Sequence, residues 1–265
     1  MIIDYTFDEV KNYLPAKKTR SNKYDSGELL LIGGDVDYPG AIILASQMAI
    51  KSGAGLVYLY TCSKNVIKVL EKHPEIIAFD SKDRLLEIIS RDITVLAGPG
   101  TKDNDWTKET FDLIKNKPLT IILDAAFMKK IKLQNSFINR ILLPHEGEAA
   151  RLLNINSSEI KKDRIKSIKK IYSSYNSTVV LKGYNTLIHD GNNIYRCLNG
   201  DSKLSTAGTG DVLAGLISSF IAQGINSIES CKLAVAIHGI SGDKFKYSRG
   251  LTASELIDLV RDTMN

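Results

Sequence analysis

Short apolar runs alternate with stretches of helical periodicity along most of the chain. The runs are rich in Leu, Ile and Val, and they span residues 29–32, 56–61, 93–97, 120–123, 140–143 and 178–181. Continuous apolar runs of this length are typical of strands that are buried on both faces of a parallel sheet. The pattern therefore predicts a sheet whose strands run mostly parallel.

Helical patterns lie between and after these runs. They include residues 41–50 and 66–72, and the C-terminal part adds 212–222, 230–247 and 253–262, with Gly224 as a helix stop. Residues 186–197 instead predict a β-hairpin, because two short strand-like pieces flank a Gly/Asn turn. Strands separated by helices predict a doubly wound α/β fold with ligands beyond the carboxyl ends of the strands. Since no repeat or long linker divides the chain, we expect one domain over residues 1–265.

Composition and charge limit the classes of ligand that the chain is expected to bind. Its 265 residues carry a net charge of +5, from scattered lysines with clusters at 17–18, 129–130 and 161–170. A nucleic-acid-binding face would interleave aromatic residues with a basic stripe, and the sequence has no such arrangement, so we expect no nucleic-acid partner. The positive excess is compatible with small polyanionic ligands but does not choose among them.

The sequence also bears on location. No apolar run approaches the ~20 residues that a membrane-spanning helix requires, so we expect no membrane partner. The chain opens without the charged and apolar segments of a signal peptide. Cys62, Cys197 and Cys231 are isolated, which argues against a disulfide framework and against a zinc site. We therefore expect a cytoplasmic protein with reduced thiols.

The most informative motif starts at Thr206 and reads T-A-G-T-G-D-V-L-A-G. Gly208 and Gly210 allow a sharp turn with bare N–H groups, and the following helix adds its positive dipole end, so we expect anions to bind there. An acid beside bound phosphate is unfavourable unless it transfers a proton, which makes Asp211 the candidate base for a substrate hydroxyl. The alternative is that Asp211 only favours the first turn of the helix.

Two glycine-rich turns follow earlier strands. Residues 33–35 read G-G-D and lead to Y-P-G-A at 38–41, where Pro39 suits the first turn of a helix and small residues let a ligand approach. Residues 98–100 read G-P-G and follow the strand that ends at residue 97. Each motif is also compatible with a plain turn between a strand and a helix.

Two further motifs carry ionisable side chains at strand ends. P-H-E-G-E at 144–148 places His145 near a ligand carbonyl or phosphate and Glu148 near the water shell of Mg²⁺, unless both residues are structural. K-G-Y-N-T at 182–186 supplies a cation, a flexible glycine and a hydroxyl, which suits a nucleotide phosphate or ribose. The alternative for this second motif is a surface turn before the hairpin.

The order of these motifs resembles that of the ADP/ATP-dependent NAD(P)H-hydrate dehydratases, which look like ribokinase-type carbohydrate kinases. The resemblance covers residues 27–243 and rests on G-G-x(4)-P-G-A, G-P-G, P-H-x-G-E, V-x-L-K-G-x-x-T and G-T-G-D-V-L-A-G. Sugar and vitamin kinases of this fold usually carry Asn where His145 stands, so the set is specific. It implies a ribokinase-like three-layer sandwich with a mostly parallel central sheet flanked by helices. No epimerase-like domain precedes the match, which predicts a stand-alone dehydratase, and relatives suggest a homotetramer.

The resemblance also implies a reaction and a role for each matching residue. The reaction is ADP- or ATP-dependent dehydration of (6S)-NAD(P)H hydrate, which restores NAD(P)H and releases AMP or ADP with phosphate. Asp211 would be catalytic and would contact the hydrated dinucleotide together with Ala41, Gly100 and His145. Glu148 would help to hold Mg²⁺ through water. The residues that would hold the adenine nucleotide are Lys182, Gly183, Tyr184, Asn185, Thr186, Gly208, Thr209 and Gly210.

Three positions depart from the family pattern. Thr101-Lys102 replaces Leu-Gly after G-P-G, Ala126 replaces the second acid of an Asp-Ala-Asp run, and Glu146 replaces Pro in P-H-P-G-E. They leave the base and the anion-binding turn in place but bear on substrate contacts near Lys102 and Asp124. Two other functions remain open, a kinase that phosphorylates a vitamin precursor or sugar alcohol, and a nucleotide-sensing or scaffold protein without turnover.

Overall fold

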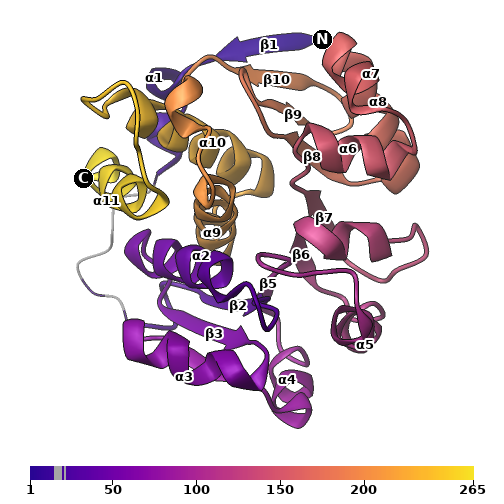
Figure 1. The fold of residues 1–265 in the computed structure, drawn as a ribbon, viewed down its shortest axis with the longest axis vertical. Coiled ribbons are helices and arrows are strands. Elements are labelled where there is room, and N and C mark those ends of the chain that lie inside the picture. The colour runs from indigo at the N-terminus through magenta and orange to yellow at the C-terminus, as the bar shows by residue number, and fades with distance from the viewer. Residues whose placement is uncertain (15–19, 21) are drawn as a thin grey trace.

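The computed structural model describes residues 1–14, 20 and 22–265, so the lysine pair at 17–18 lies outside the described residues (Figure 1). Within them, ten strands form one sheet in the order β1-β10-β9-β8-β7-β6-β5-β2-β3-β4. The strands are β1 Ile2–Tyr5, β2 Glu28–Ile32, β3 Leu56–Tyr60, β4 Ile77–Phe79, β5 Thr94–Ala97, β6 Thr120–Leu123, β7 Asn139–Leu142, β8 Thr178–Leu181, β9 Leu187–His189 and β10 Ile194–Cys197. All neighbouring pairs are parallel except those that β9 makes with β8 and β10.

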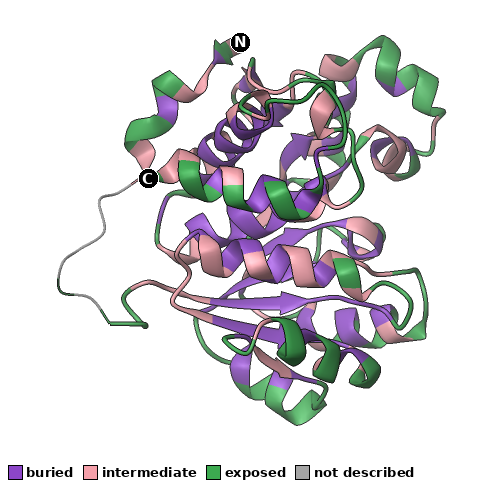
Figure 2. Cartoon of the chain, turned by 60° about the vertical axis from the view of Figure 1, so that its left-hand side comes forward, coloured by how far each residue is buried: buried purple, intermediate pink, exposed green. Residues whose placement is uncertain are grey.

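Helices cover both faces of this sheet. They are α1 Phe7–Val10, α2 Pro39–Lys51, α3 Ser63–Lys72, α4 Lys82–Ile88, α5 Asp105–Ile114, α6 Glu146–Leu153, α7 Ser157–Lys162, α8 Arg164–Tyr175, α9 Thr209–Ala222, α10 Ser227–Asp243 and α11 Ala253–Met264. Along β2, Leu29 and Leu31 pack into one apolar core with α2, α9, α10 and α11. Leu30 and Ile32 point the other way, into a second core with α4, α5, α6 and α8. The predicted three-layer α/β sandwich is confirmed, and Figure 2 shows its buried strands between helices whose outer faces are exposed.

Most predicted elements are confirmed, with corrections to their bounds. The six apolar runs form β2, β3, β5, β6, β7 and β8. The hairpin is β9–β10, and its turn is held by two backbone N–H groups that donate to Asp190 Oδ1 over 2.8 and 2.7 Å. The helix predicted at 230–247 is wrong at both ends, because the Asn226 side chain caps its start at Ser227 and the helix stops at Asp243. The edge strands β1 and β4 were not predicted.

The strand order reverses between β2 and β5, because β3 and β4 extend the sheet on one side of β2 while β5 to β8 extend it on the other. In doubly wound sheets ligands bind outside the carboxyl ends of strands at such a reversal. The turns at 33–35 and 98–100 follow these two strands. No helix in the described part of the chain combines the length and apolarity that a bilayer crossing demands.

Candidate functional site

The two glycine-rich turns after β2 and β5 are joined by backbone hydrogen bonds. Gly34 N donates to Pro99 O over 2.9 Å, and Asp35 N donates to Gly100 O over 2.8 Å. Gly34 has a φ of +73°, and a Cβ there would lie 2.6 Å from the Ile42 side chain. Glycine is therefore required at this position by conformation and by space. The turns form one rigid floor at the strand reversal.

The predicted substrate contacts Ala41 and Gly100 lie together on this floor. A Cβ on Gly100 would lie 3.2 Å from Ala41 Cβ and 2.4 Å from Tyr38 O, so the backbone here leaves no room for a side chain. Pro39 opens α2, as predicted. Lys102, the first departure from the family pattern, pairs with Asp37 at 3.0 Å and lies 4.6 Å from the centroid of the exposed Tyr38 ring. The substitution therefore adds a cation at the rim of the floor.

A buried charged cluster lies at the ends of β6, β7 and β8. Lys182 Nζ is 2.9 Å from Asp124 Oδ1 and 3.9 Å from Glu148 Oε2. The exposed fractions of these side chains are 15% for Lys182, 6% for Asp124 and 12% for Glu148, so the ion pairs are shielded from water. The prediction did not pair Asp124 with Lys182.

Asp211 enters this cluster from α9. The helix begins at Thr209 rather than Val212, which puts Asp211 in its first turn. Its carboxylate forms no hydrogen bond or ion pair with any other described residue. A Cβ on Gly210 would lie 3.6 Å from Lys182 Nζ, so the start of α9 meets the lysine directly. The position suits both readings of Asp211, the proton-transferring base and the helix-start acid.

Mutual electrostatics shift the pKa values in this cluster. Burial, together with the charge of Asp124, raises the pKa of Asp211 from 3.8 to about 7, although Lys182 opposes the shift. Burial also raises the pKa of Glu148 despite Lys182. Burial alone would lower the pKa of Lys182, but the surrounding carboxylates outweigh it and raise that pKa. Groups with opposed environments of this kind are typical of proton-transfer sites.

The sharp glycine-rich turn before α9 is formed as predicted. Gly208 is its N-cap with a φ of +92°. The Thr209 hydroxyl, however, lies 2.8 Å from Leu204 O and 2.9 Å from Thr206 O and so bonds within the preceding loop. Nε2 of the buried His238 lies 2.9 Å from Thr209 O. Thr209 therefore stabilises the turn through its side chain and through its backbone N–H, which donates to Thr206 O over 3.4 Å.

His145 and Glu148 cap the start of α6 reciprocally. The Nδ1 atom of His145 accepts the N–H of Gly147 over 3.0 Å, and Glu148 Oε2 accepts the N–H of His145 over 2.9 Å. An accepting Nδ1 leaves the ring proton on Nε2. Nε2 lies 3.5 Å from Glu148 Oε2, and the His145 side chain is 54% exposed, so a ligand can approach the ring from the solvent side. The structural and the functional reading of this pair are therefore compatible.

A cavity of about 550 Å³ opens above the turn at 182–186. It is lined by His145, Glu146, Gly147, Ser157, Lys161, Lys182, Gly183 and Tyr184. Tyr184 is 75% exposed, Asn185 has a φ of +51°, and the Thr186 hydroxyl donates to Gly183 O over 2.9 Å. The cavity thus brings four predicted ligand residues, at 145 and 182–184, to one opening, and it adds the cation of Lys161, which was not singled out.

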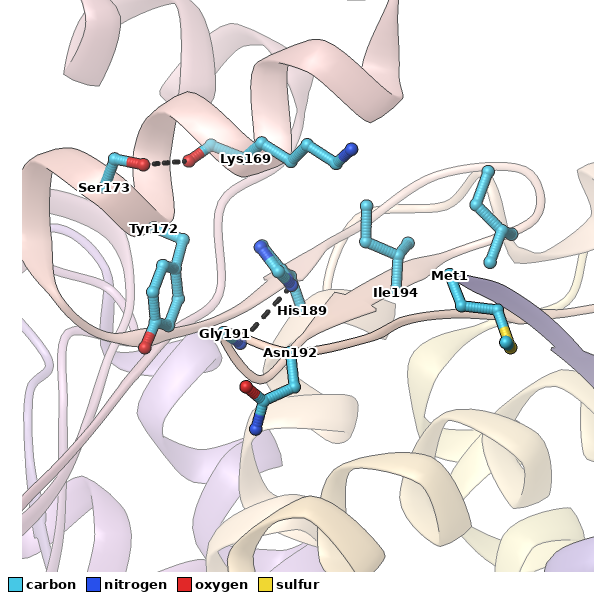
Figure 3. Close-up of a pocket in the computed structure, with 9 residues that line it drawn as sticks. Met1, Lys169, Tyr172, Ser173, His189, Gly191, Asn192 and Ile194 are labelled. Atoms are coloured by element: carbon cyan, nitrogen blue, oxygen red, sulfur yellow. Dashed lines mark hydrogen bonds between the residues drawn. The ribbon is translucent and has the colours of Figure 1, made fainter.

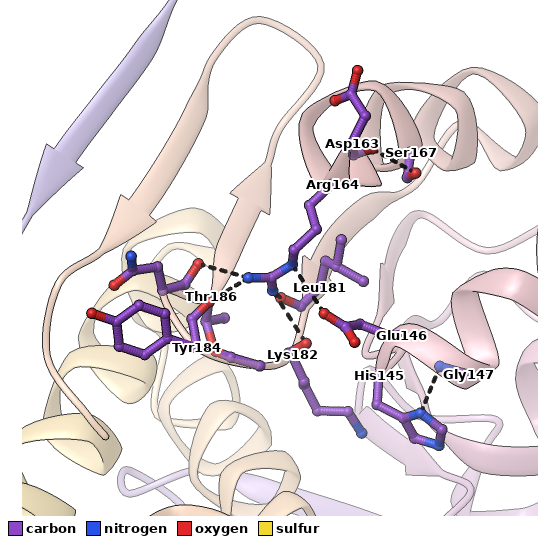
Figure 4. A network of polar contacts seen from close by, with 12 residues as sticks. His145, Glu146, Gly147, Asp163, Arg164, Ser167, Leu181, Lys182, Tyr184 and Thr186 are labelled. Carbon is purple, nitrogen blue, oxygen red and sulfur yellow. Dashed lines mark hydrogen bonds and ion pairs between the residues drawn. The ribbon is translucent and has the colours of Figure 1, made fainter. Parts of the chain in front are cut away.

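Sequence reasoning also missed Arg164, the first residue of α8. Its Nη2 donates to Leu181 O over 3.0 Å and to Lys182 O over 3.3 Å, and its Nη1 donates to Tyr184 O. Figure 4 shows the guanidinium between the turn at 182–186 on one side and Glu146 on the other. The only signal in the sequence is a basic residue after Asp163, inside a lysine-rich stretch that resembles a solvated helix face.

Two other hollows lie apart from this opening. One, of about 430 Å³, lies between α8 and the β9–β10 hairpin and includes Lys169, Tyr172 and His189 but no carboxylate (Figure 3). The other, of about 330 Å³, lies on the far side of Glu148 and includes Thr101 and Ala126, two of the departures from the family pattern. The first holds none of the predicted site residues.

The donor set around Lys182 fits Mg²⁺ held through water. Three carboxylates, of Asp124, Glu148 and Asp211, face one lysine, and the raised pKa values of Glu148 and Asp211 reflect burial and this excess of negative charge. Carboxylate oxygens are the ligands that Mg²⁺ prefers, usually with several waters retained. Among the residues the structure describes, no three acids, histidines or cysteines are arranged to hold a metal directly. A water-mediated role for Glu148 is consistent with both observations.

Comparison with known proteins identifies relatives along nearly the whole chain. The bifunctional NAD(P)H-hydrate repair enzyme of Coxiella burnetii is 32% identical over 259 residues, which are 95% of this chain and 53% of the relative. The chain thus spans about half the length of the first curated relatives it matches. The ADP-dependent (S)-NAD(P)H-hydrate dehydratase of Neisseria meningitidis is 32% identical, with 91% of this chain and 84% of that protein aligned.

Solved structures agree with this relationship. The ADP/ATP-dependent NAD(P)H-hydrate dehydratase of Bacillus subtilis, co-crystallised with ATP and Mg²⁺, superposes with a TM-score of 0.88 at 25% identity, over 98% of this chain and 97% of that chain. The model of the NAD(P)H-hydrate dehydratase family matches residues 29–263, a range that contains every residue of the proposed site. The chain therefore belongs to the NAD(P)H-hydrate dehydratase family, as its set of strand-end motifs predicts.

Proposed function

We propose that the chain catalyses the ADP- or ATP-dependent dehydration of (6S)-NAD(P)H hydrate. The observation that carries the proposal is the carboxylate of Asp211, which lies in the first turn of α9 behind a glycine turn and has a pKa raised to about 7. A base works best when its pKa lies near the operating pH. A carboxylate that only favoured a helix start would gain nothing from this shift.

One group of residues would bind the NAD(P)H hydrate, and a second group would bind ADP or ATP. Ala41 and Gly100 form a floor without side-chain bulk at the strand reversal, where the hydrated nicotinamide ring would lie. His145 would donate its Nε2 proton to the substrate. The adenine nucleotide would lie in the cavity above the turn at 182–186, with its terminal phosphate toward Lys182 and the N–H groups at the start of α9.

The chemistry requires a better leaving group than hydroxide. Asp211 removes the proton of the ring hydroxyl as its oxygen forms a bond to the terminal phosphorus of ADP or ATP, and the bond from that phosphorus to AMP or ADP breaks. N–H groups around Gly208 and Gly210 and the ammonium of Lys182 stabilise the charge on the transferred phosphoryl group. The lone pair of the ring nitrogen then expels phosphate, and loss of a proton from the adjacent ring carbon restores NAD(P)H.

Mg²⁺ would be held near Glu148 through water, and when bound it would neutralise phosphate charge. The reciprocal cap that His145 and Glu148 form keeps the Glu148 carboxylate beside Lys182 with one oxygen bonded to backbone. The other oxygen is therefore the one available to a metal-bound water.

The test compares Asp211→Asn with Asp105→Asn, which removes an exposed first-turn acid from α5. Purified protein is given NADH hydrate and ADP, and recovery of NADH absorbance and release of phosphate are followed together. Asp211→Asn is expected to lose about 10²- to 10⁴-fold in rate, while Asp105→Asn keeps wild-type turnover. Wild-type rates in Asp211→Asn would refute the role of the base. A stable phosphoester formed without free phosphate would instead establish the small-molecule kinase.

Two further expectations stay predictions. Cytoplasmic action is supported by Cys62, Cys197 and Cys231, which are all free thiols. The homotetramer suggested by the family resemblance is testable by light scattering of the purified protein.

A further inference from the structure

We propose that Arg164 is a positioning residue for the adenine nucleotide, which it serves by holding the turn at 182–185 in its binding shape, and that Glu146 fixes Arg164 in turn. The inference rests on the proposed function, because it assigns the turn to the nucleotide. Arg164 touches neither reacting group, so its effect passes through the backbone of the turn and through Lys182.

Several carbonyl groups at the turn accept hydrogen bonds from one outside donor, Arg164. Gly183 has a φ of +134° and Asn185 a φ of +51°, and this backbone directs the carbonyls of Leu181, Lys182 and Tyr184 toward one point. The Arg164 guanidinium occupies that point. The guanidinium is planar and always charged, and its N–H groups can donate to several carbonyls at once. A lysine ammonium lacks this fixed planar set of donors.

The fit of the guanidinium against the turn is close. A Cβ on Gly183 would lie 3.2 Å from Arg164 Nη2, so glycine leaves the space that the arginine fills. On the other side of the same turn, Lys182 N donates to Pro144 O over 2.9 Å, and Lys182 Nζ reaches Asp124. The position of the Lys182 ammonium therefore depends on a backbone segment that Arg164 holds from behind.

Glu146 completes the arrangement, and it stands where the family pattern P-H-P-G-E has Pro. Its Oε1 lies 3.6 Å from Arg164 Nε, a buried N–H that forms no hydrogen bond with the described residues. Burial lowers the pKa of Arg164, and the charge of Glu146 opposes that shift. The ion pair connects the turn at 182–185 to the start of α6, where His145 would meet the substrate (Figure 4).

The experiment measures the KM for ADP and the KM for NADH hydrate separately, in wild type, Arg164→Ala, Arg164→Lys, Glu146→Gln and the double variant Arg164→Ala/Glu146→Gln. Arg261→Ala, which removes an exposed arginine from α11, is the matched control. Thermal denaturation and calorimetric binding of ADP accompany each variant. Arg164→Lys and Glu146→Gln keep the inference testable even if Arg164→Ala does not fold.

We expect Arg164→Ala to raise the KM for ADP by about 10- to 100-fold with an unchanged KM for the hydrate, the size expected for charge-assisted hydrogen bonds. Arg164→Lys should give a smaller rise of the same kind, and Glu146→Gln a rise of about two- to fivefold. In the double variant, Glu146→Gln should not raise the KM for ADP beyond the value of Arg164→Ala, because the effect of Glu146 passes through the arginine.

Two different results would overturn the inference. A folded Arg164 variant could keep a wild-type KM for ADP, or its KM for ADP and its KM for the hydrate could rise by the same factor. Either result would show that the arginine only stabilises the fold. If the wild-type protein itself does not consume ADP in the presence of hydrate, the proposed function fails first, and the role of Arg164 fails with it.

Discussion

Replacing Asp211 by Asn should stabilise the protein at alkaline pH while it removes activity. The pKa of Asp211 is raised to about 7 from the value of 3.8 that an unfolded chain would show. Between about pH 4 and about pH 7 the folded protein therefore binds a proton at this site that the unfolded chain has released. The stability that this proton contributes is fully present below the unfolded pKa and is lost as the pH rises through the folded pKa.

The magnitude follows from the pKa difference. About three units at 1.36 kcal/mol each make about 4 kcal/mol the upper limit of the cost of ionising Asp211 in the folded protein. Asn has nearly the same shape and cannot ionise. The unfolding free energy of Asp211→Asn should therefore exceed that of wild type, and the excess should grow by about 2–3 kcal/mol between about pH 5 and about pH 8.

Urea unfolding of both proteins across this pH range measures the difference directly. Asp105→Asn serves as the control, because this exposed acid lies in the same kind of helix position but outside any buried cluster. Its stability curve should run parallel to that of wild type. If the curve of Asp211→Asn is parallel as well, the carboxylate is not strained by its neighbours, and the assignment of a poised base loses its physical support.

The remaining predictions concern the same cluster and the turn before α9. The kcat/KM for the hydrate should rise with pH and level off above about 7 as Asp211 ionises, and a profile that is flat through neutrality would contradict the base. Lys182→Met should lower the unfolding free energy by about 3–5 kcal/mol, because it leaves buried carboxylates without their cation; a loss near zero would show that water already screens them. Gly208→Ala should cost about 2–3 kcal/mol, since its φ is +92° and the new methyl would lie 2.6 Å from the Leu44 side chain. Gly224→Ala has a similar φ of +87° but open space around it, so a cost equal to that of Gly208→Ala would disprove the steric part of the argument.

The sequence predicts secondary structure best where burial restricts the residue types that a segment can carry. Strands covered on both faces must be apolar throughout, so the runs at 120–123 and 178–181 coincide with β6 and β8. The helix that carries Asp211 was recognised, but its start was placed three residues too late, because Thr209 and Gly210 are poor markers of a helical turn. Short edge strands such as β1 carry too few apolar residues to be told from a loop.

The site was less accessible to prediction where it depends on contacts between distant segments. His145, Glu148 and Lys182 are predicted because their motifs follow strands. His145 and Lys182 line one opening, and Glu148 Oε2 lies 3.9 Å from Lys182 Nζ. Arg164 follows no strand and stands among lysines, so only the folded backbone shows that four carbonyl groups converge on it. Local patterns therefore identified ligand-facing residues and missed the residue that supports them.

The depth of α9 in the protein has a practical consequence for altering substrate range. Ten of its fourteen residues are buried, and it packs against α2, α10 and α11, so the Asp211 carboxylate cannot be moved without repacking the interior. The side chains at the mouth are free of this constraint, since Tyr38 is 51% exposed and Tyr184 is 75% exposed. Libraries that seek a different nucleotide or a modified nicotinamide should therefore vary these two tyrosines and Lys102 and leave the helix untouched.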